Sequence, residues 1–253
     1  MKFDPLYVDQ QKDLHKVHWS KRIDGYTEEF RYENNKYCDY FRVIPYKTVK
    51  HVLDSENVGL SNRKVLIAGC GNGADIYFLR KYYNADFFVV DISQDAIDLT
   101  MRLNENIKGQ TEDLEKISFD NDSFDYSFSI HTIHHLPRPF LGIYELLRVS
   151  RYGVILVEPN DSFLPRLATK LGLIKEFEDD CKNYVFRISK HDIEKICKAC
   201  QCKVSVKRVF AIHRVAKNHL EFIILKALNF ISNLLIPFWS NYIIIYIEKR
   251  KMT

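Results

Sequence analysis

Three glycines stand on alternate positions directly after a short apolar run. The run covers residues 65–68, and the glycines are Gly69, Gly71 and Gly73. Glycine permits a sharp turn and lets a ligand approach the backbone more closely than a Cβ atom would allow. A helix that begins here would also direct unpaired N–H groups at that ligand. The stretch therefore predicts a buried strand, a tight turn and a helix start, arranged to bind a ligand.

An acidic residue follows the glycines at the spacing expected of a ribose-binding carboxylate. Asp91 ends a second apolar run, residues 87–90, and lies 18 residues after Gly73. A carboxylate at about this distance can accept hydrogen bonds from ribose hydroxyls. We interpret the two features together as the binding site of a nucleoside-containing cofactor, at the switch point of a doubly wound sheet.

The glycine motif alone does not choose between cofactors. Gly69, Gly71 and Ala74 also fit the dinucleotide pattern G-x-G-x-x-G/A, with Asp91 as its ribose acid. An NAD(P)-dependent oxidoreductase is therefore one alternative, and a non-catalytic cofactor-binding module is another.

The rest of the chain predicts the elements that must position these residues. Apolar runs alternate with helical periodicity along residues 64–157, which indicates parallel strands joined by right-handed crossovers. The expected strands are 64–69, 86–91, 107–111, 124–130 and 153–157, and the expected helices are 74–83, 93–103 and 138–149. Beyond them we expect a helix at 190–200, a strand at 203–211, a helix at 220–235 and a strand at 242–247.

Two segments stand outside this alternation. Residues 1–60 are rich in aromatic side chains and show no strand pattern, which indicates a helical segment that packs on the cofactor domain. It forms either a flap over the cofactor cleft or an ordinary part of the core. Pro45 suits the first turn of a helix within that segment. Residues 160–190 break the rhythm at a strand end, where long segments often form lids. Glu158 precedes this segment, and we expect it to lie beside the cleft.

The middle of the chain carries a second motif. Residues 117–125 read ISFDNDSFD, and residues 129–136 read SIHTIHHL. With the glycine loop, this pattern resembles the class I S-adenosylmethionine-dependent methyltransferases, in particular the small-molecule branch. The resemblance covers residues 60–160 by motif. It implies an α/β fold: a doubly wound, mostly parallel seven-stranded sheet with an antiparallel C-terminal strand.

The resemblance also implies a set of cofactor-binding positions, namely Gly69, Cys70, Gly71, Gly73, Asp91, Ile92, Thr111, Glu112 and Ile130. The glycine loop would line the methionine part of S-adenosylmethionine, and Asp91 would bind the ribose hydroxyls. Ile92 would flank the adenine, and Thr111 and Glu112 would read its amino edge. Ile130 would lie near the sulfonium.

His131 follows Ile130 and is the candidate catalytic residue that the resemblance implies. Histidine titrates in a range useful for a general base. The alternative is a structural histidine that bonds the backbone at the strand end. We expect no metal site, because His134 and His135 fit packing and hydrogen bonding at a helix start. In the cluster Cys197, Cys200 and Cys202, the first two cysteines continue an apolar helical stripe.

Two positions depart from the family pattern. No carboxylate stands at residues 66–68, where an acid often lies before the first glycine, and Gln110 stands where an acid often precedes the adenine-edge residues. An acid missing near the sulfonium or the amino group would weaken cofactor binding. Weak cofactor binding or lost activity is therefore a further alternative.

Composition excludes several other classes. The chain has 253 residues and a net charge of +4, with scattered Lys and Arg, so we expect no nucleic-acid partner. Six cysteines and the lack of an apolar secretory run after Met1 indicate a cytoplasmic protein. Residues 227–247 carry no charge but contain Asn, Ser and Pro. We expect peripheral contact with a membrane or a lipid-like substrate through residues 220–247. The sequence carries no signal for an oligomeric state.

The expected protein has a helical flap at residues 1–60 and a methyltransferase domain at residues 61–253, with a lid insertion at about 160–190. It would transfer a methyl group from S-adenosylmethionine to a small molecule. Saccharide, lipid-linked and quinone-like acceptors all suit the apolar C-terminal region.

Overall fold

The described residues of the computed structural model are 5–24, 38–177, 183–212, 216, 218–234 and 240–249. Residues 25–37 of the expected flap, 178–182 of the expected lid and 235–239 of the apolar region lie outside the described residues.

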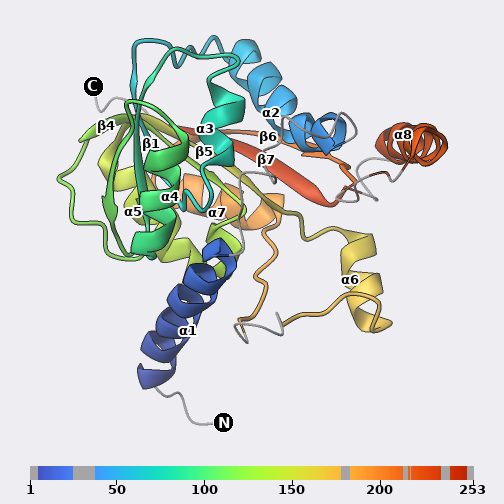
Figure 1. Ribbon diagram of the computed structural model, residues 1–253, viewed down its shortest axis with the longest axis horizontal. Coiled ribbons are helices and arrows are strands. Elements are labelled where there is room, and N and C mark those ends of the chain that lie inside the picture. The colour runs from blue at the N-terminus through green and yellow to red at the C-terminus, as the bar shows by residue number, and fades with distance from the viewer. Residues whose placement is uncertain are drawn as a thin grey trace.

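The described residues form one seven-stranded sheet in the order β3-β2-β1-β4-β5-β7-β6 (Figure 1). The strands are β1 Lys64–Ala68, β2 Asp86–Asp91, β3 Lys108–Thr111, β4 Phe124–Ile130, β5 Ser150–Pro159, β6 Lys203–Val209 and β7 Tyr242–Glu248. β7 runs antiparallel to both of its neighbours, β5 and β6. The expected fold class is confirmed.

The register brings the predicted motifs to one edge of the sheet. Ile67 of β1 pairs with Val89 of β2 on one side and with Phe128 of β4 on the other. The carboxyl ends of these three parallel strands therefore lie side by side. Because β1 has β2 on one side and β4 on the other, the chain reverses its winding there, and such a switch point forms a ligand-binding crevice.

Helices cover both faces of the sheet. They are α1 Pro5–Asp24, α2 Cys38–Ser55, α3 Ala74–Leu79, α4 Gln94–Leu103, α5 Pro139–Val149, α6 Phe163–Lys170, α7 Lys190–Ala199 and α8 His219–Leu234, with a 3-10 turn, η3, at Ile133–His135. On one face, Leu53 of α2 and Phe78 of α3 pack with Ile67 of β1. On the other face, Ile143 of α5 and Ile193 of α7 join a second core.

Several local expectations were wrong. α2 begins at Cys38, so Pro45 lies inside the helix rather than in its first turn. Proline within a helix removes one backbone hydrogen bond. α3 ends at Leu79, four residues short of the expected end. In α7, Cys197 is buried as the apolar stripe predicts, but Cys200 caps the helix and is exposed.

None of the described helices combines the length and apolar content that crossing a membrane requires.

Candidate functional site

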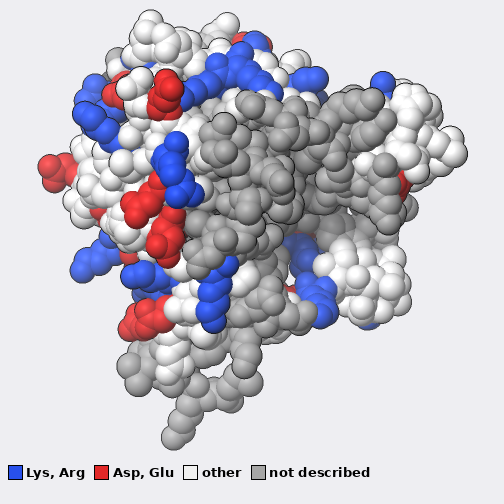
Figure 2. Space-filling model, viewed as in Figure 1, with Lys and Arg blue, Asp and Glu red and all other residues white. Residues whose placement is uncertain are grey.

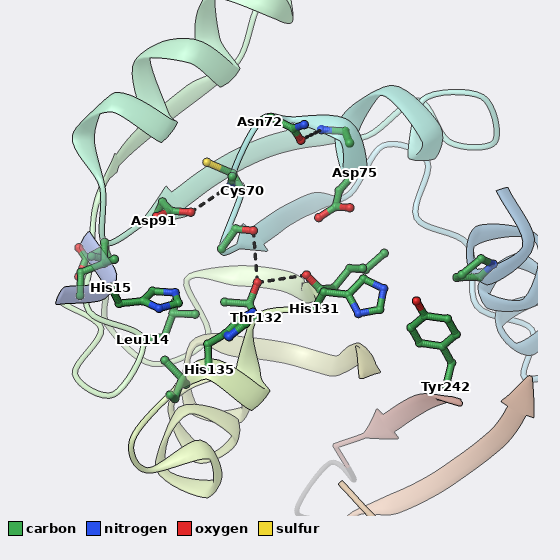
Figure 3. Close-up of a pocket in the computed structure, with 18 of the residues that line it drawn as sticks. His15, Cys70, Asn72, Asp75, Asp91, Leu114, His131, Thr132, His135 and Tyr242 are labelled. Carbon is green, nitrogen blue, oxygen red and sulfur yellow. Dashed lines mark hydrogen bonds between the residues drawn. The ribbon is translucent and has the colours of Figure 1, made fainter. Parts of the chain in front are cut away.

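A cavity of about 330 Å³ lies at the carboxyl edge of the central strands. Its wall comes from segments that are far apart in the sequence (Figure 3). The loops after β1, β3 and β4, the end of β2 and helix α3 supply one part. α1, α2, residues 211–212 and the first residue of β7 supply the rest. The fold therefore encloses a ligand-sized space where the two sequence motifs meet.

The backbone of the glycine loop has the conformation that glycine favours. Gly69, Gly71 and Gly73 have φ angles of 77°, 48° and 76°. A Cβ atom on Gly69 would lie 2.2 Å from Thr132 Oγ1, and one on Gly73 would lie 2.7 Å from Asn104 Nδ2. No other residue fits the first position without moving its neighbours, so the loop can pack tightly against the turn after β4.

Asp91 is tied to that loop by backbone hydrogen bonds. The Gly71 N–H donates to Asp91 Oδ2 at 3.0 Å, and the Ser93 N–H donates to Oδ1 at 3.0 Å. Burial raises the pKa of the Asp91 carboxyl, and these N–H donors oppose the rise. Each carboxylate oxygen has a further lone pair, which a ribose hydroxyl can use.

Most of the predicted cofactor positions line this cavity, namely Gly69, Cys70, Gly71, Asp91, Ile92, Glu112 and Ile130. Two do not. Gly73 caps α3 behind the loop. Thr111 donates from Oγ1 to Gln94 Oε1 at 2.6 Å and faces a neighbouring surface groove.

The side chain of Glu112 is already engaged within the chain. Gln110 Nε2 donates to Glu112 Oε1 at 2.6 Å, and the Ser118 N–H donates to Oε2 at 3.0 Å. The Ser118 hydroxyl adds another bond to Oε1. Glu112 thus shapes the wall mainly by its position, because both of its oxygens already accept hydrogen bonds.

Helix α1 contributes residues that sequence reasoning missed. Gln11, Lys12 and His15 line the cavity. Gln11 Oε1 is buried and has no hydrogen-bond partner among the described residues. Lys12 Nζ bonds Asp113 at 2.6 Å and Glu115 at 2.7 Å, which fastens α1 to the loop after β3. α1 has almost no amphipathic stripe, so its pattern carries no signal for this contact.

Asp75 is the second missed residue. It lies in the first turn of α3, is 8% exposed and lines the cavity. The Tyr46 hydroxyl donates to its Oδ1 at 2.6 Å. Burial raises the pKa of Asp75 to about 7, with a further contribution from the charge of Glu158, while the Tyr46 bond opposes the rise. The sequence feature that could have identified Asp75 is an acidic residue two positions after the last glycine of the loop. The family pattern instead places an acid before the first glycine.

His131 lines the cavity directly after the end of β4. Its φ of 53° is left-handed, and such a conformation costs a non-glycine residue about 1–2 kcal/mol. The His131 N–H donates to Val157 O at 2.9 Å, which holds the turn. Its ring lies 4.8 Å from the Tyr242 ring, centroid to centroid. In Figure 3 the ring points along the cavity wall toward Tyr242, and the Asp75 carboxylate lies above it.

Glu158 does not line the cavity, so the expectation that it lies beside the cleft was wrong. The residue is fully buried, and it accepts N–H bonds from Thr132 at 3.2 Å, Ile133 at 2.9 Å and His134 at 3.4 Å. His134 Nδ1 lies 2.6 Å from Oε2. Burial would raise the pKa of Glu158, but His134 and the other partners hold it below its ordinary value. Glu158 therefore anchors the turn that carries His131.

Known proteins share the region that holds both motifs. Residues 65–153 match the family described as "Methyltransferase domain". Residues 65–153 are therefore similar to a methyltransferase domain. The matched region contains the glycine loop, Asp91 and His131.

One curated relative is the phthiotriol/phenolphthiotriol dimycocerosates methyltransferase of Mycobacterium leprae. It is 32% identical over 102 residues, which is 38% of this chain and 37% of the relative. The match therefore spans little more than a third of that protein's length.

Solved structures share the fold over nearly the whole chain. A chain from the complex between the Haloferax volcanii Trm112 methyltransferase activator and a putative methyltransferase has a TM-score of 0.63 at 12% identity, covering 96% of this chain and 99% of its own. Magnesium protoporphyrin IX methyltransferase from Synechocystis, solved with bound SAH, has a TM-score of 0.59 at 15% identity, covering 97% and 99%. At these identities the likeness establishes the fold.

Proposed function

We propose that this protein transfers the methyl group of S-adenosylmethionine to a small acceptor with a long apolar part. One observation carries the proposal: the glycine loop, the Asp91 carboxylate and the turn at Ile130–His131 converge on a single cavity at the switch point of the sheet. The sheet also ends in an antiparallel pair rather than a second β-α-β half, which favours a methyltransferase over a dinucleotide enzyme.

The cavity residues fit the nucleoside part of the cofactor. We assign Asp91 to the ribose hydroxyls and Ile92 and Leu114 to the faces of the adenine. Gln11 Oε1, which has no hydrogen-bond partner among the described residues, can accept a hydrogen bond from the adenine amino group. We also assign Glu112, which lines this wall, and Thr111, which lies beside it, to the adenine side.

Asp75 fits the methionine part of the cofactor. S-adenosylmethionine carries positive charge on its sulfonium and its amino group, and a buried anion nearby stabilises a cation strongly. Asp75 lies beside the glycine loop and can supply the carboxylate that residues 66–68 lack. Gly69, Cys70 and Gly71 would then contact the methionine chain, with Gly73 holding the loop from behind.

When bound, S-adenosylmethionine supplies an activated methyl group, so the protein must mainly orient the acceptor and exclude water. Tyr46, His131 and Tyr242 build the wall on the Asp75 side of the cavity. We assign His131 as the group that accepts a proton from an acceptor hydroxyl. Its ring stands in the cavity, and the turn that holds it is fixed by Glu158.

We also propose that residues 1–60 form a flap over the cavity and that residues 160–190 contain a lid. α1 and α2 both reach the cavity, through Gln11 and Tyr46, which supports a flap at residues 1–60 over a domain at 61–253. α6 leaves the end of β5 as a short helix without a buried residue, which supports a lid within residues 160–190.

Two features support the proposal that the acceptor has a long apolar part. The mycobacterial relative is named for a lipid-like substrate, and the region after β6 exposes an apolar helix, α8. A methyl-labelled donor tests the proposal against three acceptor sets: a lipid extract, soluble sugars and quinones. We expect label in the lipid fraction and its loss in Asp91→Asn. Label in the sugars alone would contradict the apolar acceptor, and label in none of the sets would contradict the methyltransferase activity.

A further inference from the structure

Helix α8 turns its polar side toward the body of the protein. Asn229 is the buried residue of this helix, and its Oδ1 accepts the Ile212 N–H at 3.3 Å. Asn233 Oδ1 accepts the Phe210 N–H at 3.0 Å, and its Nδ2 donates to Phe210 O at 2.7 Å. Side-chain amides thus fasten α8 to the chain segment that follows β6.

The apolar side of α8 faces outward. Its large apolar residues that are each at least 50% exposed are Leu220, Ile223, Ile224, Leu228, Phe230, Ile231 and Leu234. A surface helix in water normally shows the reverse arrangement, with its apolar stripe against the core. A contiguous exposed apolar surface of this kind marks a site of interaction with a protein or a membrane.

Helix α6 repeats the pattern. No residue of this short helix is buried, and Phe163, Leu171 and Leu173, in and just after it, are each more than 60% exposed. α6 and α8 lie at the same end of the molecule's longest axis (Figure 1). In Figure 2 the regions of α8 and α6, at the right of the view, are mainly uncharged, and basic side chains lie between α6 and the body of the protein.

The C-terminal part of the chain, which contains both helices, is basic. Residues 160–253 contain 17 Lys and Arg against 9 Asp and Glu, whereas residues 1–159 contain 20 against 24. The chain as a whole has a net charge of only +4, so the positive charge is concentrated in the segment that contains both apolar helices. Exposed Lys170 and Lys226 lie on these helices themselves.

We propose that α6 and α8 dock this protein on an anionic lipid surface, with the outer side of α8 at the boundary between headgroups and acyl chains. Apolar side chains on one helix face, together with nearby basic residues, bind such surfaces through burial and electrostatic attraction. α8 is a single convex helix standing off the body, which suits immersion in a headgroup layer better than contact with a flat protein patch.

The docking surface adjoins the cavity. Ile212, which α8 holds through Asn229, lines the cavity beside Ala211, and so does Tyr242, the first residue of β7 after α8. An acceptor held in the lipid surface would therefore lie next to the wall that contains His131. The inference rests on the proposed function for its purpose, but lipid binding is measurable without the cofactor.

Vesicle flotation of the full chain tests the docking. The probes are vesicles of phosphatidylcholine alone and of phosphatidylcholine with phosphatidylglycerol. We expect the protein to float with the anionic vesicles and to be released by salt. In the double variant Ile224→Ser/Ile231→Ser the bound fraction should fall about tenfold, because two half-exposed apolar side chains no longer enter the lipid. The matched control is Met101→Ser, which changes an exposed apolar residue on α4 and should float like the wild type.

Two outcomes would overturn the proposal. One is the absence of flotation with either vesicle. The other is a concentration-dependent dimer, without lipid, that Ile224→Ser/Ile231→Ser dissociates, because α8 would then bind a second copy. Titration with S-adenosylhomocysteine, run on every variant, separates the two proposals. Flotation without cofactor binding would leave the docking intact and contradict the methyltransferase function, and cofactor binding without flotation would do the opposite.

Discussion

Two buried carboxylates, Glu158 and Asp75, have different surroundings. Glu158, at the end of β5, has three backbone N–H donors and the His134 ring within hydrogen-bond distance. Asp75, at the start of α3, has the Tyr46 hydroxyl as its side-chain partner among the described residues. The pKa of Glu158 is lowered, whereas burial raises the pKa of Asp75 to about 7.

The difference separates a structural charge from one suited to a ligand. The chain itself stabilises the Glu158 carboxylate, so that side chain holds a turn and stays away from the cavity. Asp75 faces the cavity with too few donors to stabilise its ionised form. A cation bound in the cavity would supply what the chain does not, and S-adenosylmethionine is such a cation.

The largest expected effect is on folding. Glu158→Ala should lower the free energy of unfolding by about 3–5 kcal/mol, because the N–H groups of residues 132–134 and the buried His134 ring lose their partner. Urea unfolding measures the change. Glu158→Gln keeps the shape and should cost less. A loss below about 1 kcal/mol in Glu158→Ala would contradict the anchoring role.

The same residue should give a stability that depends on pH. The pKa of Glu158 is lower in the folded protein than its ordinary value of 4.5, so its contribution is present above that value and is lost as the pH falls below it. Unfolding of Glu158→Gln should lack this part of the acid dependence.

The pH dependence of stability that Asp75 contributes should have the opposite sign to that of Glu158, and Asp75→Asn should remove it. The folded pKa of about 7 exceeds the ordinary value of 3.8, so the favourable neutral form is present at low pH and is lost as the pH rises from about 4 to 7. The variant should therefore be more stable than the wild type at pH 8, by on the order of 2–4 kcal/mol. Equal stability of the two proteins at pH 8 would contradict a strained carboxylate.

Asp75→Asn should also weaken S-adenosylmethionine binding by at least about 3 kcal/mol, which is more than a hundredfold. Calorimetry in two buffers of different ionisation enthalpy adds a second readout: near pH 7 the wild type should release protons on binding, and the variant should not. Asp95→Asn is the matched control, since Asp95 occupies the first turn of α4 but is exposed. Unchanged affinity and proton release in Asp75→Asn would remove this residue from the cofactor site.

Tyr46→Phe should also weaken S-adenosylmethionine binding, but less than Asp75→Asn does. Loss of the hydroxyl removes a donor that lowers the pKa of Asp75, so the pKa should rise further. S-adenosylmethionine affinity should fall by about 1.5–3 kcal/mol in the presence of Asp75. In the Asp75→Asn background the same change should cost less, and a double-mutant cycle by calorimetry checks this coupling.

Gln11→Ala should have the smallest effect. Gln11 Oε1 lacks a protein partner among the described residues, as Asp75 lacks sufficient donors, but it carries no charge. S-adenosylhomocysteine affinity should fall by about 0.5–1.5 kcal/mol with little change in stability. A clear loss of stability with unchanged affinity would make Gln11 a packing residue.

Local pattern predicted much of the molecule. The strands before Gly69 and Asp91 follow from apolar runs bounded by glycine or an acid, and their meeting at one sheet edge follows from parallel pairing. Asp75 was missed because its importance depends on burial behind Tyr46, 29 positions away in the sequence. The position of the Glu158 side chain was predicted wrongly. The sequence shows that Glu158 lies at a strand end, but it does not show that the N–H groups of residues 132–134 bind the carboxylate inside the protein.

Titration with S-adenosylhomocysteine and NADH tests the proposed function most directly. The wild type should bind S-adenosylhomocysteine at one saturable site and should not bind NADH. Asp91→Asn should weaken that binding at least about tenfold, whereas Asp86→Asn, at the exposed start of the same strand, should not. Saturable binding of NADH without binding of S-adenosylhomocysteine would contradict the methyltransferase function.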